Sequence, residues 1–284
     1  MLAALAAAEI LRVGVFGLFH PTELVLRAAP GQALVVEAGA SRMVLEGART
    51  LRVRAIDLAE PSPHSIHATP RGGGEFVLSV PGRIERRFRG DLEITAEAEV
   101  LVPVVAMDRE VAVASAVAAE SPPGAPLEAL MAQAVATRSY YTAAHGRHRG
   151  FDFCDTTHCQ FLRDPPAPNA LAAMAAERTR GLVLAYRGAP IAALFSASCG
   201  GRTRALENPS ADEYPYFAVD CDYCRRGPRV HCSYCDPHAE GAGHGFGLCQ
   251  TGAKGMAATG ATFREILQHY FPNTEVTLRP PAGM

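Results

Sequence analysis

The sequence predicts an α+β protein, with an N-terminal antiparallel β region followed by a mixed α/β region. Short apolar runs bounded by Gly, Pro, Ser or Asp fill roughly the first ninety residues, and arginines alternate with Val and Leu in them, as in half-buried antiparallel strands. Residues 127–140 instead follow helical spacing. The 284 residues are 48% hydrophobic and 20% charged, which is typical of a folded globular protein. We expect a β-rich region at 1–90 and a second domain at 91–284.

The expected strands of the first region are short and rich in Val, Leu and Phe. They cover residues 11–16, 23–26, 33–37, 43–45, 51–55, 76–80 and 84–88. Prolines 61, 63 and 70 and the glycines at 72–74 predict a loop before the last two of these strands. Alternation resumes from Leu92 to Val105, and the chain then enters the second region.

The helix expected at 127–140 is amphipathic. Pro126 suits a first helical position, and the apolar residues that follow it are spaced along one helical face. Gln133 and Arg138 lie on the other face. Glu120 precedes this helix in a Pro/Gly-rich loop, and active sites are commonly built from loop residues held by such a scaffold.

Further elements follow along the second region. Asn169 is expected to cap a helix that runs to Arg180. Residues 182–186 and 191–195 predict a hairpin that turns at 187–188. Thr262 and Glu265 have the spacing of a capping box, which opens a final helix that ends before Pro272. The glycines between 241 and 247 predict a tight loop that positions His244 and Gln250.

Charge and hydropathy exclude several partners. The formal net charge is −2 and no long run of Lys or Arg occurs, so nucleic acid is not an expected partner. Residues 1–9 are apolar, but they lack a basic start and are too short for a membrane span or a complete signal peptide. No other stretch reaches the length of a membrane span. We therefore expect an export signal that is absent or truncated, with a cytoplasmic start as the alternative.

Eight cysteines are the main compositional signal, and four of them form two CxxC pairs. The pairs are Cys221 with Cys224 and Cys232 with Cys235. Each CxxC turn presents two sulfurs, which suits tetrahedral binding of zinc. In an oxidising compartment the same four cysteines would form disulfides instead. Either bond gives this segment a structural role.

A second cluster combines histidine with cysteine. His148, Cys154 and Cys159 lie within one short segment, and His158 is adjacent to Cys159. This combination favours zinc, with a disulfide or buried thiols as the alternatives. His158 is either a fourth zinc ligand or a sugar contact. Three or four protein ligands leave little room for catalysis at the metal, so we expect structural zinc at one or two sites, with the metal stabilising loops.

Five segments together resemble a known family. They are Glu120–Pro122, the helix Leu127–Tyr140, Cys154–Gln160, Ser198–Thr203 and Gly243–Ala253. In this order they are similar to the stage II sporulation protein D (SpoIID) family, which includes the LytB amidase enhancers of bacterial cell walls. The similarity runs from about Gly90 to Thr274, and the N-terminal region shares only its β-rich character.

The resemblance implies a lytic transglycosylase of peptidoglycan located outside the cytoplasm. Such a lyase cleaves the β-1,4 bond between N-acetylmuramic acid (MurNAc) and N-acetylglucosamine (GlcNAc) without water and leaves a 1,6-anhydro sugar, with a preference for glycan strands stripped of peptide. The family's catalytic glutamate corresponds to Glu120, and its zinc ligands to His148, Cys154 and Cys159. A cell-wall amidase is a further implied partner, and the resemblance does not decide between a sporulation role and a vegetative one.

One carboxylate is enough for this chemistry. A glycoside hydrolase needs a second acid, whereas here the sugar's own 6-hydroxyl is the nucleophile. Glu120 would protonate the leaving oxygen and then accept the hydroxyl proton, so its pKa must be raised by an apolar or confined site. Glu128 is the rival acid, but a position in the first helical turn favours its ionised form and a structural role.

Polar residues within the matched segments are the candidate substrate contacts. They are Gln133, Arg138, Tyr140, Gln160, Ser198, His244 and Gln250. For each of them taken alone, an ordinary structural hydrogen bond is the alternative. A second function class also stands, a non-catalytic glycan-binding module that enhances an N-acetylmuramoyl-L-alanine amidase. A zinc-ribbon adaptor is a third alternative and rests on the CxxC pairs alone.

Overall fold

The computed structural model describes residues 9–58, 64–144, 147–210, 213–224 and 243–278. The chain divides into two compact units. Unit 1 comprises the described residues within 1–116 and 146–165, and unit 2 those within 117–145 and 166–284. The helix α1 (Arg109–Glu120) contains the point in the sequence where the first unit ends and the second begins.

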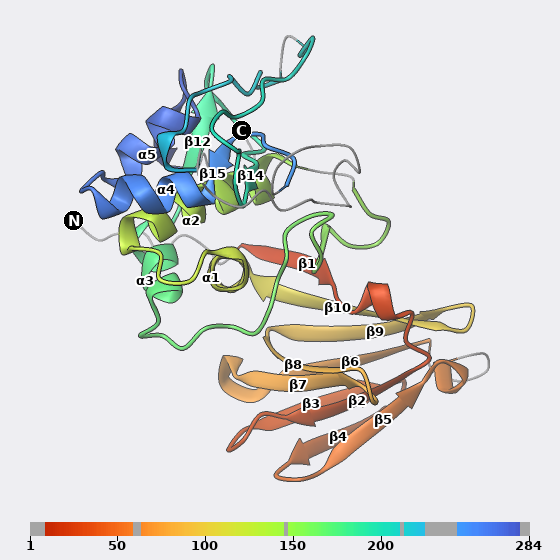
Figure 1. The fold of residues 1–284 in the computed structure, drawn as a ribbon. Coiled ribbons are helices and arrows are strands. Elements are labelled where there is room, and N and C mark those ends of the chain that lie inside the picture. The colour runs from red at the N-terminus through yellow and green to blue at the C-terminus, as the bar shows by residue number, and fades with distance from the viewer. Residues whose placement is uncertain (1–8, 59–63, 145–146, 211–212, 225–242, 279–284) are drawn as a thin grey trace. The chain divides into compact units, whose positions relative to one another are not determined.

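Unit 1 is built from two sheets (Figure 1). The larger has the order β11 (Phe153–Cys154), β1 (Ile10–Gly14), β10 (Val100–Asp108), β9 (Asp91–Glu97), β6 (Ser65–Pro70), β3 (Ala33–Ala38) and β4 (Ser41–Glu46). The smaller has the order β5 (Thr50–Arg54), β2 (Glu23–Ala28), β7 (Glu75–Val80) and β8 (Ile84–Arg89). All neighbouring strands are antiparallel except β1 and β11. The predicted antiparallel β region is confirmed.

Alternating burial along the strands builds the core of unit 1. In β2, every second residue is buried, and Leu24 and Leu26 have no exposed surface. Phe16 and Phe76 pack on either side of Phe88, each with 5.7 Å between ring centroids. Short 3-10 turns connect the strands at Gly17–Phe19, Ala55–Leu58 and Arg71–Gly73. One face of each sheet is therefore apolar, as the alternation predicts.

Two features of unit 1 differ from the sequence-based expectation. The expected loop before the strand at 76–80 contains β6, in which Ile66 and Ala68 are buried and Pro70 is the last residue, where a missing N–H costs least. The strands β9 and β10 pair with β6 and β1 and so belong to unit 1. The first boundary between the two compact units therefore lies after Ala116 and not at residue 90. Pro61 and Pro63 lie outside the described residues.

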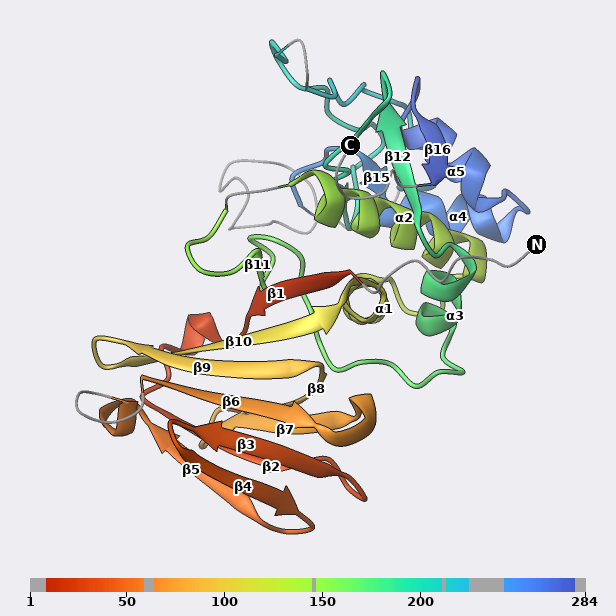
Figure 2. The ribbon, with the colours of Figure 1, turned by 180° about the vertical axis from the view of Figure 1, so that it is seen from behind.

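Unit 2 is organised around α2 (Leu127–Ala143). This helix contacts α3 (Leu171–Arg178), α4 (Gln250–Ala258), α5 (Phe263–Tyr270) and β12 (Leu182–Tyr186) (Figure 2). Every residue from Ala129 to Tyr141 is buried, so the helix is covered on all sides. The predicted polar face is wrong, because Gln133 and Arg138 are only 2% and 1% exposed. Alanines at 129, 132, 134 and 136 leave room for close neighbours.

The remaining elements of unit 2 are small. A three-stranded sheet has the order β13 (Ala189–Pro190), β12 and β16 (Glu275–Leu278). A separate parallel pair consists of β14 (Phe195–Ser196) and β15 (Leu248–Cys249), and the 3-10 turn η4 covers Asp222–Cys224. The predicted turn is confirmed, because Arg187 and Gly188 both have positive φ, as a type I′ hairpin requires. The strand expected at 191–195 is wrong, because β12 pairs with Ala189 and Pro190 and, of the expected residues, only Phe195 lies in a strand. The capping box of Thr262 and Glu265 is also confirmed. The cap of α3 is Ala170 and not Asn169.

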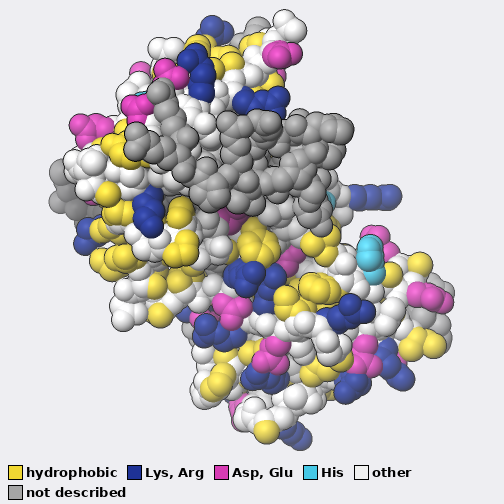
Figure 3. All heavy atoms as spheres, viewed as in Figure 1, with side chains coloured by type: hydrophobic (Ala, Val, Ile, Leu, Met, Phe, Trp, Pro, Cys, Tyr) yellow, Lys and Arg dark blue, Asp and Glu magenta, His cyan; other side chains and the backbone are white. Residues whose placement is uncertain are grey.

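Charged side chains of both signs are mixed over the surface, and those of the described residues do not form a patch of one sign on the face shown in Figure 3. In Figure 3, arginines are interspersed with Asp and Glu over the β-rich unit. Several of these form ion pairs, such as Arg27 with Glu85 and Arg89 with Glu75. Among the described helices, none combines the length and the apolar character needed to cross a bilayer.

Candidate functional site

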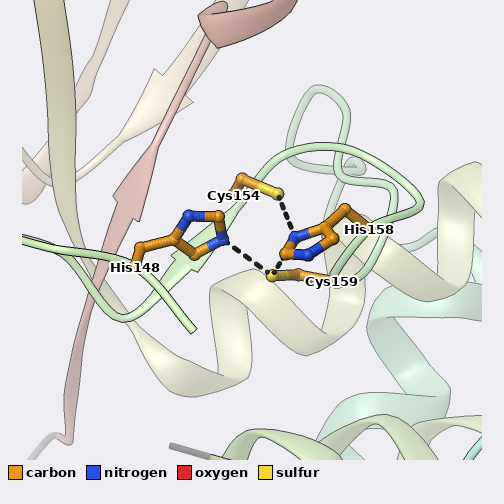
Figure 4. A group of neighbouring side chains, drawn as sticks. All are labelled: His148, Cys154, His158 and Cys159. Atoms are coloured by element: carbon orange, nitrogen blue, oxygen red, sulfur yellow. Dashed lines mark hydrogen bonds between the residues drawn. The ribbon is translucent and has the colours of Figure 1, made fainter. Parts of the chain in front are cut away.

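The His/Cys cluster predicted at 148–159 is assembled in unit 1 (Figure 4). Its four donor atoms, from His148, Cys154, His158 and Cys159, all lie within 4.8 Å of one another. His148 Nε2 is 3.2 Å from Cys159 Sγ, and His158 Nδ1 is 3.7 Å from both sulfurs. A tetrahedral zinc with bonds of about 2.0 Å to nitrogen and 2.3 Å to sulfur separates N from S by about 3.5 Å. The donor set therefore fits zinc.

The local chain explains why these donors converge. The parallel pairing of β11 with β1 sets Cys154 opposite Gly14. A side chain at Gly14 would collide with Phe151, whose ring stacks on His148 with 4.6 Å between centroids. The Thr156 hydroxyl accepts the His158 N–H and turns the chain back toward the cluster. The cluster thus depends on one strand edge, one glycine and one tight turn.

The two cysteines of this cluster have pKa values that are shifted in opposite directions. A hydrogen bond from the Cys159 thiol lowers the pKa of Cys154 to about 3, and the same bond raises the pKa of Cys159. This bond favours the thiolate on Cys154, and the thiolate is the form of cysteine that binds metal. Both cysteines are half-buried and neither forms a disulfide.

A buried ion pair lies next to the cluster. Asp155 is 4% exposed, and its carboxylate accepts the Phe16 N–H at 3.2 Å and an Arg86 N–H at 3.0 Å. Arg86 also donates to the Leu162 carbonyl. Burial raises the pKa of Asp155 to about 6 and lowers that of Arg86, so desolvation outweighs the attraction within the pair. The pair holds the 154–162 loop on the sheet.

Glu120 is the last residue of α1, half-buried in unit 2, so the expectation that it lies in a loop is wrong. Its carbonyl accepts the side-chain N–H of Gln250 at 2.8 Å. The Ser121 hydroxyl donates to Gln133 Oε1 at 2.9 Å, and Lys254 Nζ donates to the Pro123 carbonyl at 2.6 Å. Both α2 and α4 therefore hold the segment that carries Glu120.

The rival acid has a structural bond. Glu128 lies in the first turn of α2, and its carboxylate accepts the N–H of Phe263 at 2.7 Å. Phe263 is the first residue of α5, where unpaired N–H groups and the helix dipole favour a carboxylate. Glu128 thus has a structural role, as expected, and its bond joins α2 to α5.

Two of the predicted substrate contacts converge on the Glu120 segment. Gln133 and Gln250 approach it from α2 and α4, and Gln133 Nε2 has no hydrogen-bond partner among the described residues. Ser198 is half-buried after β14. Gln160 belongs to unit 1 and is 3% exposed, next to Cys159.

Three other predicted contacts are engaged inside unit 2. Arg138 donates to the carbonyls of Ala176 and Leu182. The ring of Tyr140 is 2% exposed, so it does not offer a face to a sugar. His244 accepts the Phe246 N–H at Nδ1, and burial lowers its pKa. The structure supports a packing role for these side chains.

A sulfur cluster that the sequence analysis did not predict lies in unit 2. Cys221 and Cys224 come together with Cys199 and Cys249, and all four sulfurs lie within 4.8 Å of one another. The predicted partners Cys232 and Cys235 lie outside the described residues. The CxxC spacing predicts Cys232 and Cys235, which are close in the sequence, as the partners of Cys221 and Cys224. For Cys199 and Cys249, the sequence offers only two single cysteines outside any CxxC pair.

Comparison with known proteins identifies one family and one relative. Residues 98–186 match the model of the SpoIID family, described as Stage II sporulation protein. The chain is also 26% identical over 232 residues to an uncharacterised protein of Brachyspira hyodysenteriae. That alignment covers 55% of this chain and 63% of the relative, so less than two thirds of the relative's length is matched. The family is sporulation-related and associated with the cell wall. Residues 98–186, which hold Glu120, α2 and the His/Cys cluster, are therefore similar to the SpoIID family.

Proposed function

We propose that this protein is a peptidoglycan lytic transglycosylase with Glu120 as its general acid and base. The observation that carries the proposal is the position of Glu120. It is half-buried at the end of α1, in a segment that Gln250 and Gln133 fix from two helices. A catalytic group has to be held rigidly near the reacting atoms, and side-chain bonds of this kind provide that.

The reaction transfers a proton to and from one carboxyl group. Protonated Glu120 gives its proton to the oxygen that links MurNAc to GlcNAc, and that glycosidic bond breaks. The carboxylate then takes the proton of the MurNAc 6-hydroxyl, whose oxygen bonds to the anomeric carbon and closes the 1,6-anhydro ring. No water is consumed, and Glu120 ends in its initial protonated form.

The end of a helix suits this cycle. The last turn of a helix carries a partial negative charge, which disfavours an ionised carboxylate and so favours the acid form of Glu120. Glu128 has the opposite placement and a structural bond to α5. Glu120 is therefore the better candidate of the two for the catalytic role.

The His/Cys cluster would hold a structural zinc through His148, Cys154, His158 and Cys159. Four protein ligands leave no open coordination position, so the metal would fix the loop and take no part in the chemistry. The substrate would be glycan strands of the cell wall, outside the cytoplasm, with a preference for strands stripped of peptide.

The decisive experiment compares wild-type protein with Glu120→Gln on purified, peptide-stripped glycan. Wild type should release products ending in 1,6-anhydro-MurNAc, detected by mass spectrometry, and Glu120→Gln should release none while still sedimenting with the glycan. Glu177→Gln is the matched control, because Glu177 is an exposed carboxylate paired with Arg180 in the same unit. If wild type binds glycan but yields no anhydro product, the protein is a binding module that assists an amidase.

A further inference from the structure

The four-cysteine cluster of unit 2 draws on three separate segments. Cys199 follows β14, Cys221 directly precedes the turn η4, Cys224 is the last residue of that turn, and Cys249 is the N-cap of α4. Cys221, Cys224 and Cys249 are buried, and Cys199 is half-buried. None of the four forms a disulfide. All four lie beyond residue 186, outside the segment matched by the family model.

The sulfur separations fit one tetrahedral metal ion. Cys224 Sγ lies 3.2 Å from Cys199 Sγ, 3.3 Å from Cys221 Sγ and 3.8 Å from Cys249 Sγ. Zinc–sulfur bonds of about 2.3 Å in a tetrahedron separate the sulfurs by about 3.8 Å. Cys224 is close to all three of the others, whereas two disulfides would need two separate pairs. A thiolate set of this kind selects zinc over harder cations.

The surroundings suit negatively charged sulfur. The N–H groups of Cys199 and Gly252 donate to Cys249 Sγ at 3.4 and 3.3 Å. The Tyr270 hydroxyl lies 3.2 Å from Cys221 Sγ. Donors to metal-bound sulfur stabilise the thiolate and fix its orientation. Cys249 is also the N-cap of α4, and its sulfur accepts the Gly252 N–H at the start of that helix.

Gly252 leaves the space that the cluster occupies. A Cβ at this position would lie 2.5 Å from Cys221 Sγ and 1.8 Å from the Tyr270 hydroxyl oxygen. Both distances are far shorter than van der Waals contact. Gly252 lies inside α4, where glycine is otherwise an unfavourable residue, so its presence there agrees with a packing requirement.

We propose that Cys199, Cys221, Cys224 and Cys249 bind one zinc ion as a closed structural site. The ion joins the Ser196–Gly201 segment, the η4 turn and the start of α4. It is a second zinc site, independent of His148, Cys154, His158 and Cys159, and its ligands differ from the set that the CxxC spacing predicts. The proposal does not depend on the catalytic role of Glu120.

The test is the zinc content of the purified full chain, measured by mass spectrometry of the metal against protein concentration. Wild type should hold two zinc ions per chain, one for each cluster. The double variant Cys199→Ser/Cys249→Ser should lose one of them. The matched control, Cys232→Ser/Cys235→Ser, should keep both. The proposal is overturned if Cys199→Ser/Cys249→Ser keeps its full zinc content, or if Cys232→Ser/Cys235→Ser loses one equivalent.

A second measurement needs no variant and so does not depend on the folding of one. X-ray absorption of wild type at the zinc edge should show sulfur as the majority ligand, because four cysteines bind one ion while two cysteines and two histidines bind the other. Intact-mass analysis under denaturing conditions, without reductant, should find all four thiols reduced. Disulfide-linked cysteines among the four, or an iron–sulfur signature in place of zinc, would contradict the proposal.

Discussion

His244 is a buried titratable residue whose protonation state is set by its neighbours. Its Nδ1 accepts the Phe246 N–H at 3.0 Å, so the proton of the neutral ring lies on Nε2. Burial lowers the pKa of His244, the nearby Arg204 lowers it further, and a backbone bond to Phe195 acts in the opposite direction. The folded protein therefore holds His244 in its neutral form.

This neutral histidine makes the stability of the protein pH-dependent. The unfolded chain takes up a proton near pH 6.5, the ordinary pKa of histidine, whereas the folded chain takes it up only at lower pH. Between these two values the unfolded state binds more protons, so the free energy of unfolding falls as the pH decreases below about 6.5. His244→Asn keeps an acceptor in place of Nδ1 and does not titrate, so it should flatten this dependence. Urea unfolding at about pH 7 and pH 5 measures the slope, and equal slopes in both proteins would contradict the role assigned to His244.

At the level of elements, Arg138 connects α2 to its neighbours. Its guanidinium donates to the Ala176 carbonyl near the end of α3 and to the Leu182 carbonyl at the start of β12. A cation at the C-terminal end of a helix also complements the helix dipole. With 1% of its surface exposed, Arg138 gives three elements a common polar anchor.

Removal of this anchor should cost stability rather than substrate affinity. Arg138→Ala leaves buried carbonyls without donors, and we expect the free energy of unfolding to fall by about 3 kcal/mol or more. Urea denaturation followed by circular dichroism measures the change. Arg187→Ala is the control, because Arg187 lies in the exposed hairpin turn. A substrate-binding role for Arg138 would instead give normal stability with weakened glycan binding.

Local signals predicted most of the strands and several of the turns. The strand at 84–88 and the capping box at 262–265 were recognisable because residue alternation and cap chemistry are encoded within a few residues. The helix α1 was missed because valines at 111 and 113 alternate with other residues, as they would in a strand. In the structure, Val113 and Val117 are buried on the same face of this helix, so tertiary packing favours the helix over a strand.

The helix α4 was missed for a different reason. Gly252 and Gly255 lower its helix propensity, and the sequence analysis assigns no element to residues 250–258. In the structure, a side chain at Gly255 would meet the Tyr223 ring at 2.2 Å, and one at Gly252 would meet Cys221. These glycines serve tertiary contacts between distant segments, which residue spacing does not reveal. The same limit applies to the cysteines, since Cys199 and Cys249 are 50 positions apart.

Across the whole molecule, each unit has one candidate metal cluster among its described residues. The sequence located the first cluster, because all four donors lie in one short segment. It did not locate the second, because its ligands come together only when unit 2 folds. Metal should therefore contribute to the stability of both units.

Removal of zinc should lower the stability of the whole protein. Binding to the folded state alone adds about 4 kcal/mol per site when free zinc exceeds the dissociation constant about 1,000-fold. Treatment with a strong chelator should accordingly lower the midpoint of thermal unfolding, and addition of zinc should restore it. Addition of magnesium is the control, because cysteine and histidine are poor magnesium ligands. An unchanged midpoint after verified zinc removal would show that neither cluster depends on metal.

The two clusters also differ in when they can form during synthesis. His148 to Cys159 emerge from the ribosome almost together, so a short nascent segment already contains a complete donor set. Cys199 and Cys249 are 50 positions apart in the sequence, and the second set stays incomplete until translation has passed residue 249. Maturation of unit 2 is therefore tied to the metal available after that point, and a cell short of zinc would accumulate chains whose C-terminal part has not yet closed.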